Sequence, residues 1–204
     1  MSFNMTIDNE IALITFDDGK VNAVGFGLID AFNQALDSAE ADAKAVVIYG
    51  GEGKFCGGFD LSVMKGEDKG QQQALVSAGA ALVKRLYAFP KPVIMAAEGH
   101  SIALGAIFLM AADLRIGKDG DTKYGLNETA IGMVLPSFGM ELAKARLAST
   151  SQTVKAGYLD AAVPQDNVLN TAMSYAAQLK MLPSSAFAES KRQLRKETLE
   201  KMGV

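Results

Sequence analysis

The sequence predicts an α/β protein in which the first part is built on a sheet and the last part is helical. Two β-branched runs, 11–16 and 45–49, flank a segment with helical spacing of its apolar residues, 26–40. A third such run, 93–97, follows another helical pattern, and two further helical patterns close the chain. Strands that alternate with helices favour a sheet covered by helices.

Composition fits one globular domain over residues 1–204. Hydrophobic residues make up 49% of the chain and charged residues 21%, which is typical of soluble proteins with a sizeable core. We expect a core from about residue 1 to about 147 and a helical C-terminal region from about 157 to 204. The net charge of −3 gives no electrostatic reason to expect a nucleic acid or an anionic membrane as partner.

The elements of the first half follow from local patterns. The run 11–16 is rich in β-formers and ends in the turn Asp17-Asp18-Gly19. Within 26–40, apolar residues recur every three or four positions, as on one face of a helix. The run 45–49 is a buried strand by its length and β-branching, and the glycine-rich stretch "GEGKFCGGFD" that follows it is expected to be a loop.

The next predicted element is a helix over 71–88, which ends before Pro90 and Pro92. After the buried strand 93–97, the stretch "GHSIALGAIFLMAAD" is expected to be a loop that enters a buried helix. A short strand is expected at 114–116. Apolar spacing predicts a helix over 168–179, and 184–201 is predicted as a charged helix with Lys and Arg on several faces.

Several features suggest a reducing compartment and no membrane. Cys56 is the single cysteine, so no internal disulfide forms, and His100 is the single histidine, which excludes a His-rich metal site. No other ligand cluster indicates a metal. The first residues lack the features of a signal peptide, the last five carry no targeting address, and the longest apolar run, 102–112, is too short to span a bilayer. We expect a cytoplasmic protein.

Three segments could carry chemistry. The glycine pair in "FCGGFDL", 55–61, lets the backbone approach a ligand, although taken alone a tight turn between a strand and a helix is the commoner explanation. The helix start within "GHSIALGAIFLMAAD" offers free N–H groups to an anion, although an ordinary core helix also fits. In "YGLNETAIGMVLP", Asn127 and Glu128 either begin a short helix or place a carboxylate in apolar surroundings that raise its pKa.

Taken in this order, the three segments resemble the crotonase (enoyl-CoA hydratase/isomerase) superfamily. "KFCGGFDLSVM" is similar to its first oxyanion loop, "KPVIMAAEGH" to the strand that follows, and "ALGAIFLMAADLRI" to its second oxyanion helix. "AGYLDAAVP" resembles the segment ahead of its C-terminal helices. The resemblance extends from about residue 5 to about residue 195.

The resemblance implies a fold of repeated β-β-α units that binds acyl-CoA thioesters in fatty acid β-oxidation, as a homotrimer or a dimer of trimers. It implies no separate cofactor, since coenzyme A enters as part of the substrate. The backbone N–H groups of Phe59 and Leu104 would hold the thioester oxygen, with Gly105 as an alternative to Leu104. The implied substrate-binding residues are Gly58, Phe59, Asp60, Leu61, Ser62, Leu104 and Gly105.

The chain departs from the family pattern in two places. Leu104 stands where the family usually has glycine, so the N–H remains but the Cβ restricts the backbone. Between Leu147 and Gly157 the chain is shorter than the family by roughly one helix, either as a natural deletion or because a stretch is missing from the sequence. Both departures keep open a non-catalytic acyl-CoA-binding or assembly protein.

Glu128 and Ile107 indicate which reaction the resemblance implies. Hydratases of the family use two glutamates, of which the second matches Glu128, whereas the first falls at Ile107, which cannot carry a proton. The segment "GLNET" resembles the Δ3-Δ2-enoyl-CoA isomerases, in which its glutamate is the sole acid/base. The alternative is another enolate reaction, hydration or thioester hydrolysis. We interpret Cys56 as a buried hydrophobe and His100 as a structural hydrogen-bonding group.

Overall fold

The larger of two sheets forms the centre of the molecule. The structure is a computed structural model of the chain, and it describes residues 2–129, 132, 134–146 and 157–202. The larger sheet has the strand order β1-β2-β3-β5-β7-β9, in which β1 and β2 form an antiparallel hairpin and the other neighbours are parallel. Its strands are β1 (Ser2–Asp8), β2 (Ile11–Asp17), β3 (Ala45–Tyr49), β5 (Val93–Ala97), β7 (Leu114–Lys118) and β9 (Ala161–Val163).

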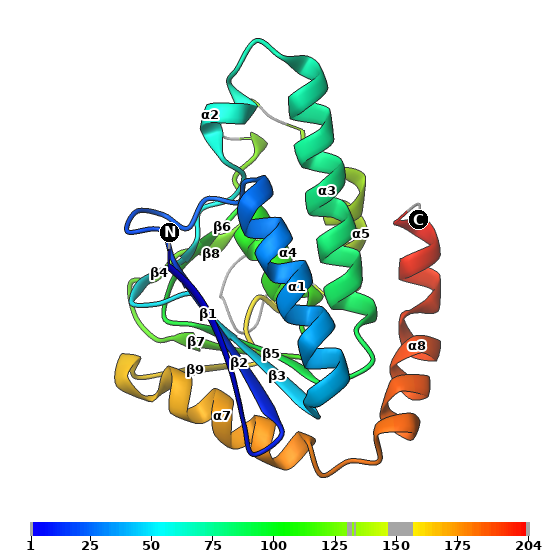
Figure 1. The fold of residues 1–204 in the computed structure, drawn as a ribbon. Helices are drawn as coiled ribbons and strands as arrows, with labels where there is room; N and C mark the ends of the chain where they lie inside the picture. The colour runs from blue at the N-terminus through cyan, green and yellow to red at the C-terminus, as the bar shows by residue number, and fades with distance from the viewer. Residues whose placement is uncertain (1, 130–131, 133, 147–156, 203–204) are drawn as a thin grey trace.

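The smaller sheet consists of three short parallel strands in the order β4-β6-β8 (Figure 1). These are β4 (Gly53–Cys56), β6 (Gly99–Ile102) and β8 (Tyr124–Gly125). The consecutive pairs β3-β4, β5-β6 and β7-β8 each give one strand to the larger sheet and the next to the smaller one. A helix follows β4 and β6 in turn, so the chain has the repeated β-β-α units that the family resemblance implies.

The larger sheet is covered on both faces because its strands carry apolar side chains on both. Val46 and Ile48 of β3 lie in the larger core, whereas Ala45 and Val47 point to the opposite face. The larger core contains α1 (Phe26–Asp42), α3 (Lys69–Ala88) and α4 (Leu104–Ala111). The opposite face is covered by α7 (Val168–Leu179), through side chains that include Ala172 and Ala176.

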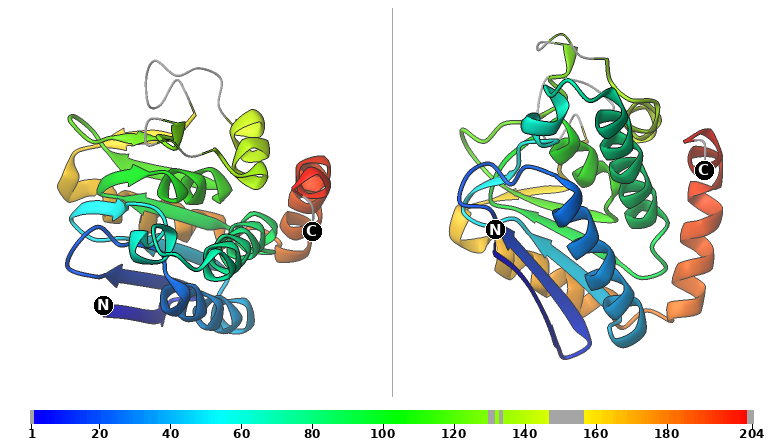
Figure 2. Two further views of the ribbon diagram at one scale, coloured as in Figure 1. Left: turned by 90° about the horizontal axis from the view of Figure 1, so that it is seen from above. Right: turned by 45° about the horizontal axis from the view of Figure 1, so that its top comes forward.

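The described structure also contains three further α-helices and a short 3-10 helix, η2 (Gln165–Asn167). The one-turn helix α2 (Leu61–Met64) follows β4, and α5 (Ser137–Arg146) packs against α4. The C-terminal helix α8 (Ser184–Lys201) lies along the outer side of α3 and α5, at the edge of the molecule (Figure 2). None of the helices that the structure describes is both long enough and apolar enough to cross a membrane.

Parts of the sequence-based expectation were wrong or incomplete. Gly53–Cys56 and Gly99–Ile102 were expected to be loops but are strands, because each pairs with the other in the smaller sheet. The region after residue 157 is not purely helical, since β9 joins β7 in the larger sheet. Strands β1 and β8 and helix α5 were not predicted. The short stretch between Leu147 and Gly157 lies outside the described residues.

Candidate active site

The smaller sheet brings the three sequence segments together. Cys56 of β4 is paired with Ser101 of β6, which is paired with Tyr124 of β8. Because the strands are parallel, their carboxyl ends lie at one edge, where α/β proteins commonly bind ligands. Phe59 lies three residues beyond this row of partners, as does Leu104, and Glu128 lies four residues beyond it.

In the first segment, the backbone N–H of Phe59 has no hydrogen-bond acceptor among the described residues. The N–H of Val24 donates to the carbonyl of Gly58 at 2.8 Å, and the N–H of Asp60 donates to the carbonyl of Val24 at 3.0 Å. In extended backbone, successive N–H groups point in opposite directions. The N–H of Phe59 therefore points away from Val24, and within the described part of the chain it has no hydrogen-bond acceptor.

A buried asparagine outside the sequence-predicted set holds this segment in place. Asn22 is 1% exposed, and its Nδ2 donates to the carbonyls of Gly50 at 2.6 Å and Phe55 at 3.1 Å. These bonds join the end of β3 to β4. The carboxylate of Asp18 in turn accepts the N–H of Asn22 at 2.8 Å. A lone asparagine after a turn gave no sequence signal for this role.

The second segment contains the first turn of α4, where backbone N–H groups lack partners within the helix. The first hydrogen bond inside this helix runs from the N–H of Ile107 to the carbonyl of Ala103 at 3.1 Å. The N–H of Leu104, one helix position after Ala103, therefore has no partner in its own helix. A Cβ on Gly105 would lie 2.2 Å from the carbonyl oxygen of Cys56, so only glycine lets α4 approach β4 this closely.

Ala103, the residue before α4, has a strained backbone. Its φ of 53° and ψ of −122° lie in a region that residues with a Cβ rarely adopt. The N–H of Ala103 donates to the carbonyl of Gly125 at 3.0 Å, which fixes this conformation against β8. Strain at a ligand-facing turn is common where a backbone donor must point in a set direction.

Glu128 provides a buried carboxyl group. The residue is 7% exposed, and its Oε2 atom has no hydrogen-bond partner among the described residues. Burial raises the pKa of this carboxyl above its usual value, against the backbone N–H groups of residues 127 and 128, which lower it. Asn127 was considered as a helix cap, but its Oδ1 atom is also buried without a partner in the described structure. This supports the pocket interpretation of the segment over the helix-start interpretation.

The three segments line one cavity of about 210 Å³. Of the residues predicted from the sequence, the cavity is lined by Phe59, Leu61, Leu104 and Glu128. The other four predicted residues, Gly58, Asp60, Ser62 and Gly105, are not among its lining residues. The remaining lining residues are Gly57, Met64, Val76, Ala103, Ile107, Asn127 and Pro136.

The predicted residues outside the lining have other contacts. Asp60 caps α2, because its Oδ1 accepts the N–H of Ser62 at 2.8 Å and the hydroxyl of Ser62 at 2.7 Å. Gly58 has a φ of 103°, in the region that favours glycine, and its carbonyl accepts the bond from Val24. These residues shape the segment around Phe59.

Sequence reasoning did not assign Met64, Val76 or Pro136 to the cavity, since apolar residues of a helix stripe or loop give no sign of which cavity they face. It also missed Tyr158, which is 9% exposed. Burial raises the pKa of the Tyr158 hydroxyl, and the negative charge of Glu128 raises it further. Tyr158 is therefore part of the electrostatic environment of the carboxyl group.

Cys56 and His100 have the structural roles expected from the sequence. Cys56 is fully buried, and burial raises the pKa of its thiol to about 12, which leaves it protonated at neutral pH. The Nδ1 atom of His100 accepts the N–H of Lys123 at 3.0 Å, which links β6 to the chain before β8. Within the described residues, no three His, Cys, Asp or Glu side chains gather as a metal site would require.

The fold and the cavity together define a class of protein. Free backbone N–H groups at two segment ends and a buried carboxyl group form a site of the kind that stabilises an oxyanion while a proton moves. The sequence profile described as enoyl-CoA hydratase/isomerase matches residues 6–152. The chain therefore belongs to the enoyl-CoA hydratase/isomerase family, within the crotonase superfamily.

Solved structures and curated relatives agree with this assignment. An enoyl-CoA hydratase/isomerase family protein from Pseudomonas syringae superposes with a TM-score of 0.94 at 36% identity, over 98% of this chain and 93% of that one. An enoyl-CoA isomerase from Mycobacterium tuberculosis superposes with a TM-score of 0.91 at 33% identity, over 98% and 93% of the two chains. The mitochondrial enoyl-CoA delta isomerase 1 of Rattus norvegicus is 28% identical over 94% of this chain and 73% of its own length.

Other relatives are longer proteins. The chain is 31% identical to a glyoxysomal fatty acid beta-oxidation multifunctional protein of Cucumis sativus, over 83% of this chain. It spans about a quarter (26%) of the length of that relative.

Proposed function

We propose that the protein shifts the double bond of a 3-enoyl-CoA thioester to give the 2-enoyl-CoA. The observation that carries the proposal is that Glu128 is the one ionisable side chain among the described residues that line the cavity. Isomerisation needs a single group that removes a proton and returns it. The position where family hydratases have a further glutamate holds Ile107, which is 1% exposed and packs against Gly139.

The proposed reaction begins at C2 of the substrate. The Glu128 carboxylate takes a proton from C2, and the electron pair moves onto the thioester oxygen to give a dienolate. The N–H groups of Phe59 and Leu104 donate to this oxygen, and in comparable enzymes the loss of one such donor costs about 3–4 kcal/mol. The protonated Glu128 then delivers the same proton to C4, so that no water or cofactor is consumed.

Burial of the carboxyl group supports this role. A base that works near neutral pH is most effective when its pKa is raised toward that pH, and burial shifts the pKa of Glu128 in this direction. The apolar lining also excludes water from the dienolate, which favours return of the proton over exchange with solvent. The Oε2 atom has no hydrogen bond to another described residue that would have to break before it takes a proton.

A second candidate is hydration of a 2-enoyl-CoA. Hydration stays a candidate because similar proteins carry both names: one Mycobacterium tuberculosis protein is called an isomerase in one structure and a probable hydratase in another. Asn127, beside Glu128, also lines the cavity, and its Oδ1 atom has no hydrogen-bond partner among the described residues. With Glu128 alone, however, hydration lacks a second proton carrier.

An assay with two substrates separates these candidates. The wild-type protein is incubated with a 3-enoyl-CoA and, separately, with the 2-enoyl-CoA of the same chain length, and products are separated by chromatography. Isomerase activity gives 2-enoyl-CoA from the first substrate and little 3-hydroxyacyl-CoA from the second. Rapid formation of 3-hydroxyacyl-CoA from the 2-enoyl-CoA would favour the hydratase, and free coenzyme A would favour a hydrolase. No turnover of either substrate would favour a non-catalytic acyl-CoA-binding protein.

We also propose that the chain assembles as a trimer or a dimer of trimers. Apolar side chains at the surface of the isolated chain support this, since Met181, just after α7, is 77% exposed and Tyr175 of α7 is 39% exposed. Exposed apolar residues on neighbouring elements are typical of subunit interfaces.

A further inference from the structure

A second cavity lies between α8 and the core, away from the candidate active site. Its volume is about 620 Å³, and it shares no lining residue with the cavity around Glu128. Asp113, which lines it, precedes β7 and accepts the N–H of Val93, the first residue of β5, at 2.8 Å. The second cavity therefore lies at the amino ends of these strands, whereas the candidate active site lies at carboxyl ends.

The lining of this second cavity carries an excess of positive charge. Its charged lining residues are Arg146 of α5, Lys191 and Arg195 of α8, and the carboxylate of Asp113. Lys191 is 6% exposed and Arg195 is 7% exposed, so solvent screens their charges poorly. Three cations thus face a single carboxylate.

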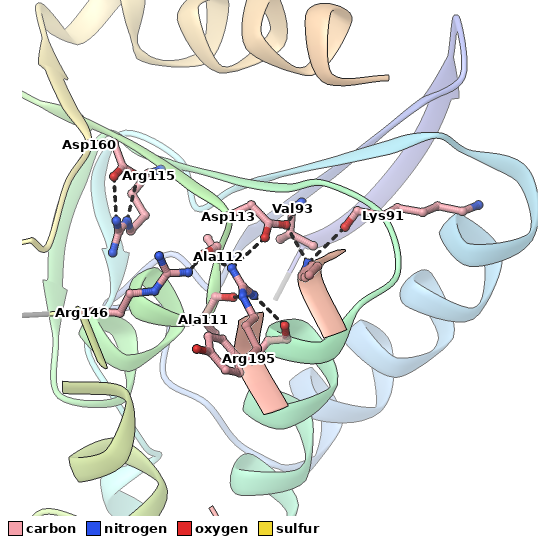
Figure 3. Close-up of polar contacts among 11 residues, drawn as sticks. Lys91, Val93, Ala111, Ala112, Asp113, Arg115, Arg146, Asp160 and Arg195 are labelled. Carbon is pink, nitrogen blue, oxygen red and sulfur yellow. Dashed lines mark hydrogen bonds and ion pairs between the residues drawn. The ribbon is translucent and has the colours of Figure 1, made fainter. Parts of the chain in front are cut away.

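Asp113 already forms ion pairs with two of the three cations. Its Oδ1 accepts Arg195 at 2.7 Å, and its Oδ2 accepts the N–H of Val93 at 2.8 Å (Figure 3). Lys191 also donates to Oδ2, at 2.7 Å. The nearby carboxylate of Asp160 is held by Arg115 through bonds of 2.7 and 2.9 Å. Arg146 is therefore left without a carboxylate among the described residues.

Backbone carbonyls satisfy these cations only in part. Arg195 donates to the carbonyls of Tyr87 at 2.6 Å, Ala111 at 3.3 Å and Ala112 at 3.2 Å. Arg146 donates through Nη2 to the carbonyl of Ala112 at 2.8 Å (Figure 3). Such contacts at helix ends stabilise a cation, but they supply about half of an elementary charge. The Nε atom of Arg146 is buried and has no acceptor in the described structure.

The ionisation of Lys191 agrees with an uncompensated site. Burial lowers its pKa to about 8, Asp113 acts in the opposite direction, and the charges of Arg195 and Arg146 lower it further. An anion in the cavity would remove this repulsion.

We propose that the cavity between α8 and the core binds a small oxyanion, the phosphate group of a free phosphate ion or of a phosphorylated metabolite. Arg146 and Lys191 would bind its oxygens, and Arg guanidinium groups suit phosphate geometry well. The volume of about 620 Å³ admits either source. The competing explanation is that the cluster only anchors α8, and in that case the cations need no ligand.

Titration calorimetry with inorganic phosphate tests the proposal on the full chain at pH 7.5, with ionic strength held constant by chloride. We expect saturable binding to the wild-type protein and a loss of affinity of roughly ten- to a hundredfold in Arg146→Gln, because a charge-assisted hydrogen bond is removed. Arg192→Gln is the matched control, since Arg192 lies on the outer side of α8, is 64% exposed and pairs with Glu189. Its affinity should equal that of the wild type.

Two further measurements complete the test. Glycerol 3-phosphate replaces phosphate in a parallel titration: tighter binding than phosphate assigns the site to a phosphorylated metabolite, and weaker binding assigns it to the free ion. Sulfate, whose charge is constant, should bind the wild type more weakly above pH 8, as Lys191 loses its proton beside Asp113, Arg195 and Arg146. The proposal is overturned if no anion binds saturably, or if folded Arg146→Gln binds phosphate as the wild type does. Should Arg146→Gln not fold, sulfate binding that is independent of pH from 7 to 9.5 overturns it.

Discussion

Replacing Glu128 by glutamine separates a catalytic carboxyl from a helix-start charge. The substitution keeps the shape of the side chain and removes its ability to carry a proton. If Glu128 is the acid/base, turnover of 3-enoyl-CoA should fall by roughly 10²–10⁴-fold, the usual effect of losing a general base. Binding of the substrate should change little, because the backbone donors at Phe59 and Leu104 remain.

The same variant should be more stable than the wild type at neutral pH. The Glu128 carboxyl is buried, and its folded-state pKa lies above the ordinary value of 4.5. The folded protein therefore binds the proton of this carboxyl more tightly than the unfolded chain does. This contribution to the free energy of unfolding is fully present below pH 4.5 and is lost as the pH rises through the folded-state pKa. Burying a carboxylate costs more free energy than burying a neutral amide of the same shape, and a difference of about 1 kcal/mol would raise the Tm of Glu128→Gln at pH 7 by roughly 2–4 °C. This gain should shrink as the pH is lowered toward 4.5.

The assays are steady-state kinetics and calorimetric melting of the wild type, Glu128→Gln and a control. Glu197→Gln is the matched control, because Glu197 is 80% exposed on α8 and pairs with Lys201. It should match the wild type in both rate and Tm. An unchanged rate together with a lowered Tm in Glu128→Gln would refute the reasoning, since a helix-start carboxylate contributes about 0.3–1 kcal/mol of stability and no catalysis.

Three further predictions concern strain, substrate size and assembly. Ala103→Gly should raise the free energy of unfolding by about 1 kcal/mol, because relief of a strained φ exceeds the entropic cost of glycine, and a lower value in denaturant titration would contradict this. Gly79→Ala should raise KM for long 3-enoyl chains more than for short ones, because a Cβ there would lie 2.5 Å from the ring of Phe59, which lines the cavity. Gly27→Ala is the control: its Cβ would meet no atom within 4 Å, so the ratio of KM for long chains to KM for short chains should equal that of the wild type. Light scattering should give three or six times the chain mass of 21.5 kDa, and a monomer mass at micromolar concentration would exclude the proposed trimer.

The sequence predicted the larger sheet and the long helices well because they follow periodic apolar patterns. The β-branched runs at 11–16, 45–49 and 93–97 are strands, and the helix over 184–201 begins and ends as predicted. The smaller sheet was missed because its strands have two to four residues and few β-formers. Their conformation depends on pairing between distant segments, which no local pattern records.

The candidate site could be predicted only in part. The positions of Phe59, Leu104 and Glu128 came from a family resemblance, and their presence in one cavity follows from a register that the sequence does not display. The strained backbone of Ala103 left no signal, since alanine is common at helix starts and interiors. Lys191 and Arg195 belong to a helix predicted to carry Lys and Arg on several faces, and no pattern indicated that these two are buried against Asp113.

The fate of a deuterium atom at C2 of the substrate tests the central claim most directly. A 3-enoyl-CoA deuterated at C2 is converted by the wild-type protein in ordinary water, and the 2-enoyl-CoA product is examined by NMR and mass spectrometry. Because Glu128 is 7% exposed, a single buried carboxyl should return much of the label before it exchanges with water. We predict 2-enoyl-CoA that carries deuterium at C4. A product without deuterium at C4, or a 3-hydroxyacyl-CoA as the main product, would contradict proton transfer by one carboxyl group.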